Sequence, residues 1–175
     1  ANGESFCKAL ESACIEALQI DSFNLWWYAG FKGKKVDLNL EEFFKENIFR
    51  DTENFLENFD INFLDISFDK GIYVIVCEIF GKNPDLPKYT VGVQGAVSLK
   101  NALYRSFMEA VTVLEFNMNI SWMESEKYQN PIPDKINNLE DNVMKYARFG
   151  KGAKPEHKLQ IEFESHDADP LENVR

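Results

Sequence analysis

Hydrophobic and polar residues follow two different periods along this chain, and the periods separate helices from strands. Between Ser5 and Tyr28 the apolar residues recur at helical spacing and predict a long amphipathic helix. Its buried stripe is expected to consist of Phe6, Ala9, Leu10, Ala13, Ala17 and Leu18. Residues 40–59 predict a second helix, rich in phenylalanine, that packs on the core. After a proline-containing break at residues 130–134, residues 139–149 predict another helix.

Three shorter segments have the β-branched and aromatic content of strands. Residues 61–67 and 72–80 are joined by a short turn and predict a β-hairpin. Residues 89–97 predict a third strand that leads into a further helix, and residues 159–163 form a candidate strand in a polar tail. The pattern indicates an α+β fold, in which an antiparallel or mixed sheet packs against amphipathic helices.

One pattern occurs twice and suggests an internal helix repeat. Residues 5–17 and 98–110 both read S-x3-A-L-x5-E-A, and each copy predicts a helix that begins with a serine N-cap. The repeat places Glu16 and Glu109 at matching positions. Two carboxylates directed to one place would suit a divalent cation, because hard cations prefer oxygen ligands. The alternative is that the helices are unrelated and that both glutamates are simply solvated.

Other polar residues accompany these glutamates at helical spacing. On the first helix, one polar face carries Lys8, Ser12, Glu16 and Gln19. On the second copy, Arg105 lies one turn before Glu109, so the two side chains can pair or contact a common ligand. Taken alone, this pair is better explained as an ordinary surface salt bridge.

Length and charge narrow the function classes. A chain of 175 residues suffices for one domain with a real core. The formal net charge of -10 disfavours binding to nucleic acid or to anionic membranes, because both need clustered Lys and Arg. The apolar run at residues 72–77 is too short to cross a bilayer. We read Cys7, Cys14 and Cys77 as reduced and expect a cytoplasmic protein.

Familiar chemical motifs are not found. No Walker A loop or dinucleotide-binding fingerprint is present, and the pair Gly92 and Gly95 alone is too weak to indicate one. His157 and His166 both fall in the polar tail, so a histidine-based triad or zinc site is not indicated. The cysteines lack a nearby base, so a thiol nucleophile is not expected. Carboxylates remain as the candidate functional groups.

Several segments, taken in order along the chain, resemble the sequence pattern of the YcaO family. The similar segments are Asn2-Gly3, Ala9-Leu10, Glu16, Asp21, Trp26-Trp27, Gly71–Val76, Gly92–Ala96, Ala102–Ala110 and Leu139–Ala147. We expect residues 1–150 to form a YcaO-like domain, and residues 151–175 to form a polar C-terminal tail. The alternative is an unrelated acidic α+β domain. In that case this ordered series of matches would have arisen by chance.

The resemblance implies an α+β domain that binds ATP and Mg²⁺ through carboxylates. YcaO enzymes phosphorylate the oxygen of a peptide backbone amide after a nucleophile has added to its carbonyl, giving azolines or thioamides. The resemblance implies Glu16 and Glu109 as Mg²⁺ ligands, and both of them with Arg105 as nucleotide-binding residues. The expected partners are a precursor peptide, another protein of a modification complex, or a second copy of the chain.

Three residues of the first helix depart from the family pattern. Lys8 stands where the family usually has a glutamate, Gln19 replaces the second glutamate of its E-x-x-E-R motif, and Ile20 replaces the arginine. These changes predict a weakened or lost nucleotide site on a retained scaffold. The family's N-terminal half, which supplies further ligands, is not found here, so we expect this chain alone to be inactive. The proline-rich C-terminus of many azoline-forming members is not found either. A non-catalytic partner or peptide-binding subunit is the alternative to an enzyme.

Overall fold

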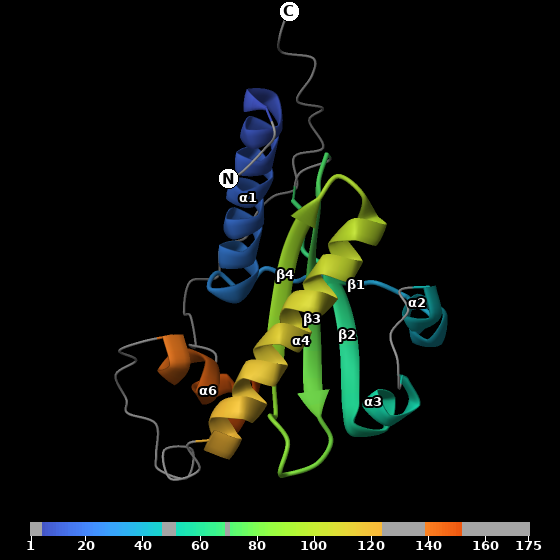
Figure 1. The fold of residues 1–175 in the computed structure, drawn as a ribbon. Coiled ribbons are helices and arrows are strands. Elements are labelled where there is room, and N and C mark those ends of the chain that lie inside the picture. The colour runs from blue at the N-terminus through green and yellow to red at the C-terminus, as the bar shows by residue number, and fades with distance from the viewer. Residues whose placement is uncertain (1–4, 47–51, 69–70, 124–138, 152–175) are drawn as a thin grey trace, which may run out of the picture.

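A four-stranded antiparallel sheet forms the centre of the computed structural model, which describes residues 5–46, 52–68, 71–123 and 139–151 (Figure 1). The strands pair in the order of the chain: β1 (Lys34–Lys35), β2 (Phe59–Asp65), β3 (Tyr73–Gly81) and β4 (Thr90–Ala96). The predicted hairpin is confirmed as β2 and β3, in which Phe63 lies opposite Cys77. Strand β1 was not predicted, because two exposed lysines show no apolar alternation.

Helices surround this sheet and confirm the α+β class. They are α1 (Phe6–Trp27), α2 (Leu40–Glu46), α3 (Thr52–Asn58), α4 (Leu99–Met123) and α6 (Leu139–Phe149). Of the helix predicted over residues 40–59, the segments 40–46 and 52–58 are helical, residues 47–51 lie outside the described residues, and the predicted end was wrong because Phe59 already begins β2. Both repeat segments are helical. The Ser5 hydroxyl accepts the Lys8 amide, and the Ser98 carbonyl accepts the Ala102 amide.

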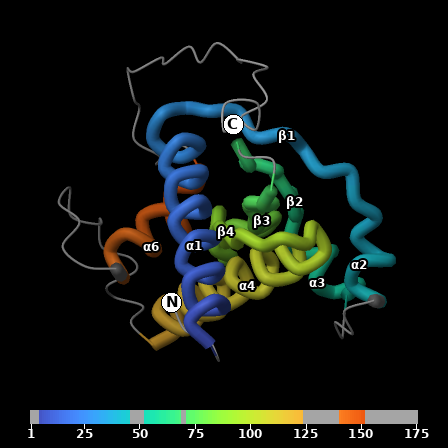
Figure 2. The backbone as a smooth tube through the Cα atoms, turned by 90° about the horizontal axis from the view of Figure 1, so that it is seen from above, coloured from blue at the N-terminus to red at the C-terminus, as the bar shows by residue number. Residues whose placement is uncertain are grey.

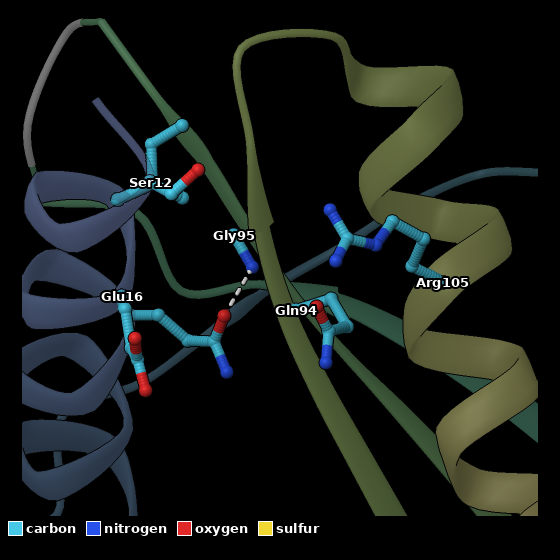
Figure 3. Close-up of a pocket in the computed structure, with 7 residues that line it drawn as sticks. Ser12, Glu16, Gln94, Gly95 and Arg105 are labelled. Carbon is cyan, nitrogen blue, oxygen red and sulfur yellow. Dashed lines mark hydrogen bonds between the residues drawn. The ribbon is translucent and has the colours of Figure 1, made fainter. Parts of the chain in front are cut away.

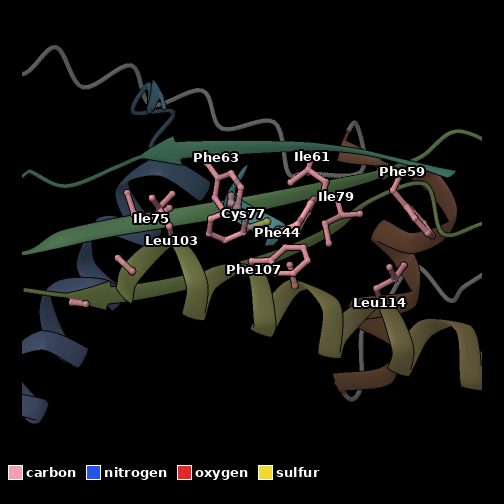
Figure 4. Close-up of a cluster of buried hydrophobic side chains, with 14 residues drawn as sticks. Phe44, Phe59, Ile61, Phe63, Ile75, Cys77, Ile79, Leu103, Phe107 and Leu114 are labelled. Atoms are coloured by element: carbon pink, nitrogen blue, oxygen red, sulfur yellow. The ribbon is translucent and has the colours of Figure 1, made fainter. Parts of the chain in front are cut away.

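The larger core lies between the sheet and α4, with α2 and α3 beside it (Figure 4). Alternate residues of β3 enter this core, because successive side chains of a strand point to opposite faces. The labelled members include Ile75, Cys77 and Ile79 from β3, Phe44 from α2, and Phe107 from α4. Edge-on aromatic contacts join the layers, such as Phe43 against Phe107 at 5.9 Å and 88°.

A second core covers the opposite face of the sheet. It consists of Trp26, Trp27, Ile66, Val74, Val76 and Tyr89. Tyr146 of α6 packs against it, with its ring edge-on to Trp27 at 5.0 Å. Viewed from above, α1 runs beside β4 while α4 crosses the sheet on the other side (Figure 2). Strand β4 is therefore an edge strand flanked by the two helices of the repeat.

The buried stripe predicted for α1 was wrong. Phe6 is 81 % exposed and Leu10 is 53 % exposed, whereas Ser22, Trp26 and Trp27 are buried. The apolar spacing identified the helix but not the face that meets the sheet. The close approach of α1 to the backbone of β4 selects that face, and a residue count along the helix does not contain this information.

Several predicted features lie outside the described residues. These are the break at residues 130–134, the candidate strand at 159–163 and the tail beyond residue 151. Within the part of the chain that the structure describes, no helix combines the length and the apolarity that crossing a membrane requires.

Candidate functional site

Two glycines let the repeat helices approach the edge strand closely. A Cβ atom at Gly92 would lie 2.3 Å from the Ser106 carbonyl oxygen and 2.4 Å from the Ala110 nitrogen, so α4 packs directly on this backbone. A Cβ atom at Gly95 would lie 3.0 Å from Cγ2 of Ile15 on α1. Glycine within a strand often marks such a close approach. Gly92 and Gly95, which were too weak a signal to indicate a nucleotide-binding motif, therefore allow both helices to pack closely on β4.

Side chains of the two helices satisfy the outer hydrogen-bonding groups of β4. The Gln19 amide donates to the Val93 carbonyl at 3.0 Å and accepts from the Gly95 amide at 2.7 Å. From the other side, the Glu109 carboxylate accepts from the Val93 amide at 3.1 Å and from the Gln94 side chain at 2.9 Å. The unpaired edge of a strand can pair with a strand of another chain. These hydrogen bonds occupy the outer backbone groups of β4 at Val93 and so block such pairing there.

A cavity of about 370 Å³ lies at the upper end of this edge, between α1 and α4 (Figure 3). The residues that line it are Ser12, Ile15, Glu16, Gln19, Gln94, Gly95 and Arg105. In Figure 3 the Arg105 side chain extends from α4 toward β4, and Ser12 and Glu16 belong to the facing helix. Polar residues from two helices and one strand thus converge on one space, although they lie far apart in the sequence.

The cavity brings together two of the three residues that the sequence selected. Glu16 and Arg105 both line it. Glu109 is not among the lining residues, because its carboxylate is directed to the β4 backbone and to Gln94. Sequence reasoning placed Ser12 and Gln19 on the polar face of α1, and both line the cavity. It did not select Gln94 as a site residue.

The three departures from the family pattern differ in position. Gln19 lies in the cavity wall, and both ends of its amide bond to β4. A carboxylate there could accept from the Gly95 amide but could not donate to the Val93 carbonyl. The two hydrogen bonds to β4 therefore explain why a glutamine occupies this position. Ile20 is 51 % exposed, and neither it nor the exposed Lys8 lines the cavity.

The donor set suits an anion with an accompanying cation better than a bare metal ion. The described residues contain no group of three or more His, Cys, Asp or Glu side chains that could hold a metal. The cavity offers one carboxylate, Glu16, and one guanidinium, Arg105. A guanidinium matches phosphate oxygens in a two-pronged geometry, and Mg²⁺ commonly binds one or two carboxylates together with substrate phosphates.

The thiols do not contribute to this site. Cys7 and Cys14 are exposed on α1, and Cys77 is buried in the sheet. Burial, with a smaller effect of the Glu78 charge, raises the pKa of the Cys77 thiol well above its usual value. A protonated and buried thiol is a poor nucleophile, so Cys77 is not a candidate for one.

Comparisons with known proteins give the context of this arrangement. The family model described as YcaO cyclodehydratase, ATP- and Mg²⁺-binding, matches residues 1–175. A search of curated proteins found no match. Among solved structures, the E. coli microcin synthetase McbBCD complex with pro-MccB17 bound is similar with a TM-score of 0.64 and 18 % identity, over 97 % of this chain and 44 % of that chain.

Two further solved structures share the fold. A heterocyclase in complex with substrate and cofactor has a TM-score of 0.59 and 19 % identity, over 92 % of this chain and 20 % of that chain. The heterocyclase TruD has a TM-score of 0.55 and 24 % identity, over 69 % of this chain and 17 % of that chain.

The chain thus spans less than half the length of each of these proteins, and identities this low show the fold alone. The match to the family model covers the whole chain and confirms the resemblance that the sequence motifs indicated. This chain belongs to the YcaO family.

Proposed function

We propose that this chain is part of a protein that modifies peptide backbones in the manner of YcaO cyclodehydratases, and that the cavity between α1 and α4 is a weakened nucleotide site. The family is described as binding ATP and Mg²⁺. The observation that carries the proposal is the hydrogen bonding of Gln19. Its oxygen and its nitrogen each bond to the backbone of β4, at the position where the resemblance to the family implies a metal-binding glutamate.

The cavity retains a partial set of groups for a nucleotide. Arg105 would contact phosphate oxygens, and Glu16 would contact a Mg²⁺ ion that the phosphates already hold. Glu109 would act by holding Gln94 and the β4 backbone in place. Bound ATP would supply the phosphoryl group that activates an amide oxygen. The residues of this chain would position the phosphates and neutralise charge, which is most of what phosphoryl transfer needs from a protein.

We expect ATP to bind weakly because α1 lacks charged groups that the family pattern has. Neither Lys8 nor Ile20 lines the cavity, so neither replaces the lost groups. A single carboxylate gives little affinity for Mg²⁺ in the absence of phosphate, because the ion gives up its hydration water reluctantly. We therefore expect ATP to bind with a dissociation constant of about 1 mM or weaker.

A titration of the chain with ATP in the presence of Mg²⁺, followed by calorimetry, tests the proposal. The expected result is weak heat that disappears in Arg105→Ala and persists in Arg148→Ala, a matched change on α6 outside the cavity. Micromolar binding that needs both Arg105 and Glu16 would overturn the claim of a weakened site.

A second candidate function is that of a non-catalytic partner in a modification complex. One observation favours it: the similar microcin synthetase is a complex solved with pro-MccB17 bound. In that case the chain would bind a precursor peptide or a partner protein without using ATP. Binding of a precursor peptide unchanged in Arg105→Ala would support this candidate over the first.

A further inference from the structure

The outer face of α1 carries an apolar stripe that stays exposed in the part of the chain that the structure describes. It consists of five residues, which form the seam of this helix: Phe6, Leu10, Ala13, Ala17 and Ile20. They recur at alternating intervals of four and three residues, as the contacting residues of a coiled coil do. All five are exposed, Phe6 by 81 % and Ile20 by 51 %. A continuous apolar stripe of this kind indicates an interaction surface.

The sheet does not use this seam, because α1 packs on it with a different face. Ile15 and Gln19 approach Gly95 of β4, and Trp26 and Trp27 are buried in the second core. In Figure 1 the N-terminal part of α1 stands at one side of the sheet, and α6 lies near its other end. The helix therefore has two apolar faces, of which the sheet covers one.

The seam is complementary to itself in size when a second copy of the helix runs antiparallel to the first. One alignment places Phe6 opposite Ala17 of the second copy and Leu10 opposite Ala13 of the second copy. A two-fold axis repeats both contacts, so each layer combines one large and one small side chain. Layers of this kind fill the space between two helices without voids or overlap.

The residues beside the seam fit the same alignment. On one side, Cys7 lies next to Cys14 of the second copy, and the two-fold axis repeats this pair. On the other side, Glu16 lies next to Ala9 of the second copy. The alignment therefore brings no two like charges together along the seam, although the chain as a whole has a net charge of -10.

Other alignments of two α1 helices fit less well. An antiparallel pair shifted by seven residues would bring the two copies of Glu16 together and would set Phe6 against the polar Asn24. A parallel pair would set Ala13 against itself, which leaves a void, and would place Glu16 beside Asp21. Like charges in such positions repel each other. Size and charge thus select one alignment.

We propose that two copies of this chain associate through the seam, with their α1 helices antiparallel. The occupant of the exposed stripe is thus the same stripe of a second copy. Ser12, Ile15 and Gln19, which line the candidate nucleotide cavity, lie off the seam and are not covered by the pairing. The dimer is an inference separate from the nucleotide site.

Sedimentation equilibrium of the full chain tests the association. The sheet already holds α1 as a helix, so a seam of about four turns should give a dimer with a dissociation constant of about 10–100 μM. The chain should be monomeric at about 1 μM and mainly dimeric at about 500 μM.

A charge placed in the seam should disrupt the dimer. Leu10→Glu should weaken the association at least about tenfold, because the carboxylate would lose water in an apolar layer. Met108→Glu, at an exposed position on α4, should leave it unchanged. Leu10 is 53 % exposed in one copy, so the variant should fold, which thermal unfolding checks. Should it not fold, Ala13→Glu at another exposed position of the seam makes the same test.

A short bis-maleimide, which joins two nearby thiols, maps the alignment. Cys77 is buried and should not react. Cys7→Ser alone and Cys14→Ser alone should give little cross-linked dimer, because like cysteines of the two copies are two helical turns apart along the axis. An equal mixture of the two variants should give at least about fivefold more, since Cys14 of one chain then lies beside Cys7 of the other.

Three outcomes would overturn the inference. A monomer mass at about 500 μM would mean that something other than a second copy covers the seam. A dimer as stable in Leu10→Glu as in wild type would place the interface on another face. A mixture that cross-links no better than the single variants would refute the antiparallel alignment. None of these results depends on ATP, so the dimer can fail without affecting the proposed nucleotide site.

Discussion

At the scale of single residues, Gln19 shows how a departure from a family pattern acquires a structural role. Its amide donates to Val93 and accepts from Gly95, which docks α1 on the edge strand. No acidic side chain can do both when ionised. The residue that reads in the sequence as a lost metal ligand is, in the structure, a bridge between a helix and a strand.

Gln19→Glu should therefore destabilise the protein while restoring the charge of the family motif. A carboxylate would face the Val93 carbonyl without a proton to donate, and we expect a loss of about 1–3 kcal/mol in the free energy of unfolding at pH 7. The loss should shrink below about pH 4, where the carboxyl is protonated and can donate. Urea denaturation measures both values. Glu16→Gln, one turn away and exposed, should change the free energy by less than about 0.5 kcal/mol. Equal stability of Gln19→Glu and wild type would contradict the bridge.

Tyr89 makes a separate prediction about alkaline pH. Its hydroxyl donates to the buried Glu78 at 3.0 Å, and Lys151 also contacts that carboxylate. Burial and the Glu78 charge raise the pKa of Tyr89 above its usual value. Above about pH 10 the unfolded chain releases this proton while the folded chain keeps it, so stability must fall as pH rises. The buried Cys77 thiol, whose pKa is also raised, adds to the fall from about pH 8.5.

Tyr89→Phe should reduce that alkaline loss. One titrating group contributes about 1.4 kcal/mol per pH unit above its pKa in the unfolded chain, so the slope of stability against pH should decrease by up to this amount. Tyr104→Phe removes an exposed hydroxyl and serves as the control. Denaturant unfolding between pH 8 and 11 gives the slopes. A slope for Tyr89→Phe equal to that of wild type would show that Tyr89 is not the group responsible.

At the scale of elements, the contact between α4 and β4 depends on the absence of a side chain at Gly92. An added methyl group would meet backbone atoms of Ser106 and Ala110, which cannot rotate away. Gly92→Ala should destabilise the protein by about 1–3 kcal/mol or more, as overpacking of a core does. Gly71→Ala, where nothing lies within 4 Å, should be neutral or slightly stabilising. Thermal unfolding compares the two, and similar melting temperatures would contradict the close approach.

The sequence predicted most elements because their patterns are local. Helical spacing identified α1, α4 and α6, and the hairpin of β2 and β3 followed from two apolar runs around a turn. The face of α1 could not be predicted in this way. Phe6 and Leu10 belong to the apolar stripe by spacing but remain exposed, because contacts with β4 determine the inward face. The end of the second predicted helix was misplaced for a related reason: the phenylalanines of residues 40–59 keep a helical spacing in the sequence up to Phe59, which begins β2.

At the scale of the whole molecule, the candidate site forms because two similar helices flank one edge strand. The repeat and the resemblance together selected Glu16 and Arg105, which the fold brings to one cavity. They could not reveal that Glu109 turns to the strand, because that depends on which backbone groups of β4 are left unpaired.

The dependence of ATP affinity on Mg²⁺ tests the central claim most directly. Calorimetric titrations of the chain with ATP would be compared in excess Mg²⁺ and in a chelator, for wild type and for Glu16→Gln. A weakened site with one remaining carboxylate predicts that Mg²⁺ strengthens ATP binding less than about threefold, and that Glu16→Gln removes this small effect. A strengthening of a hundredfold or more, lost in Glu16→Gln, would show an intact magnesium nucleotide site and would contradict the account.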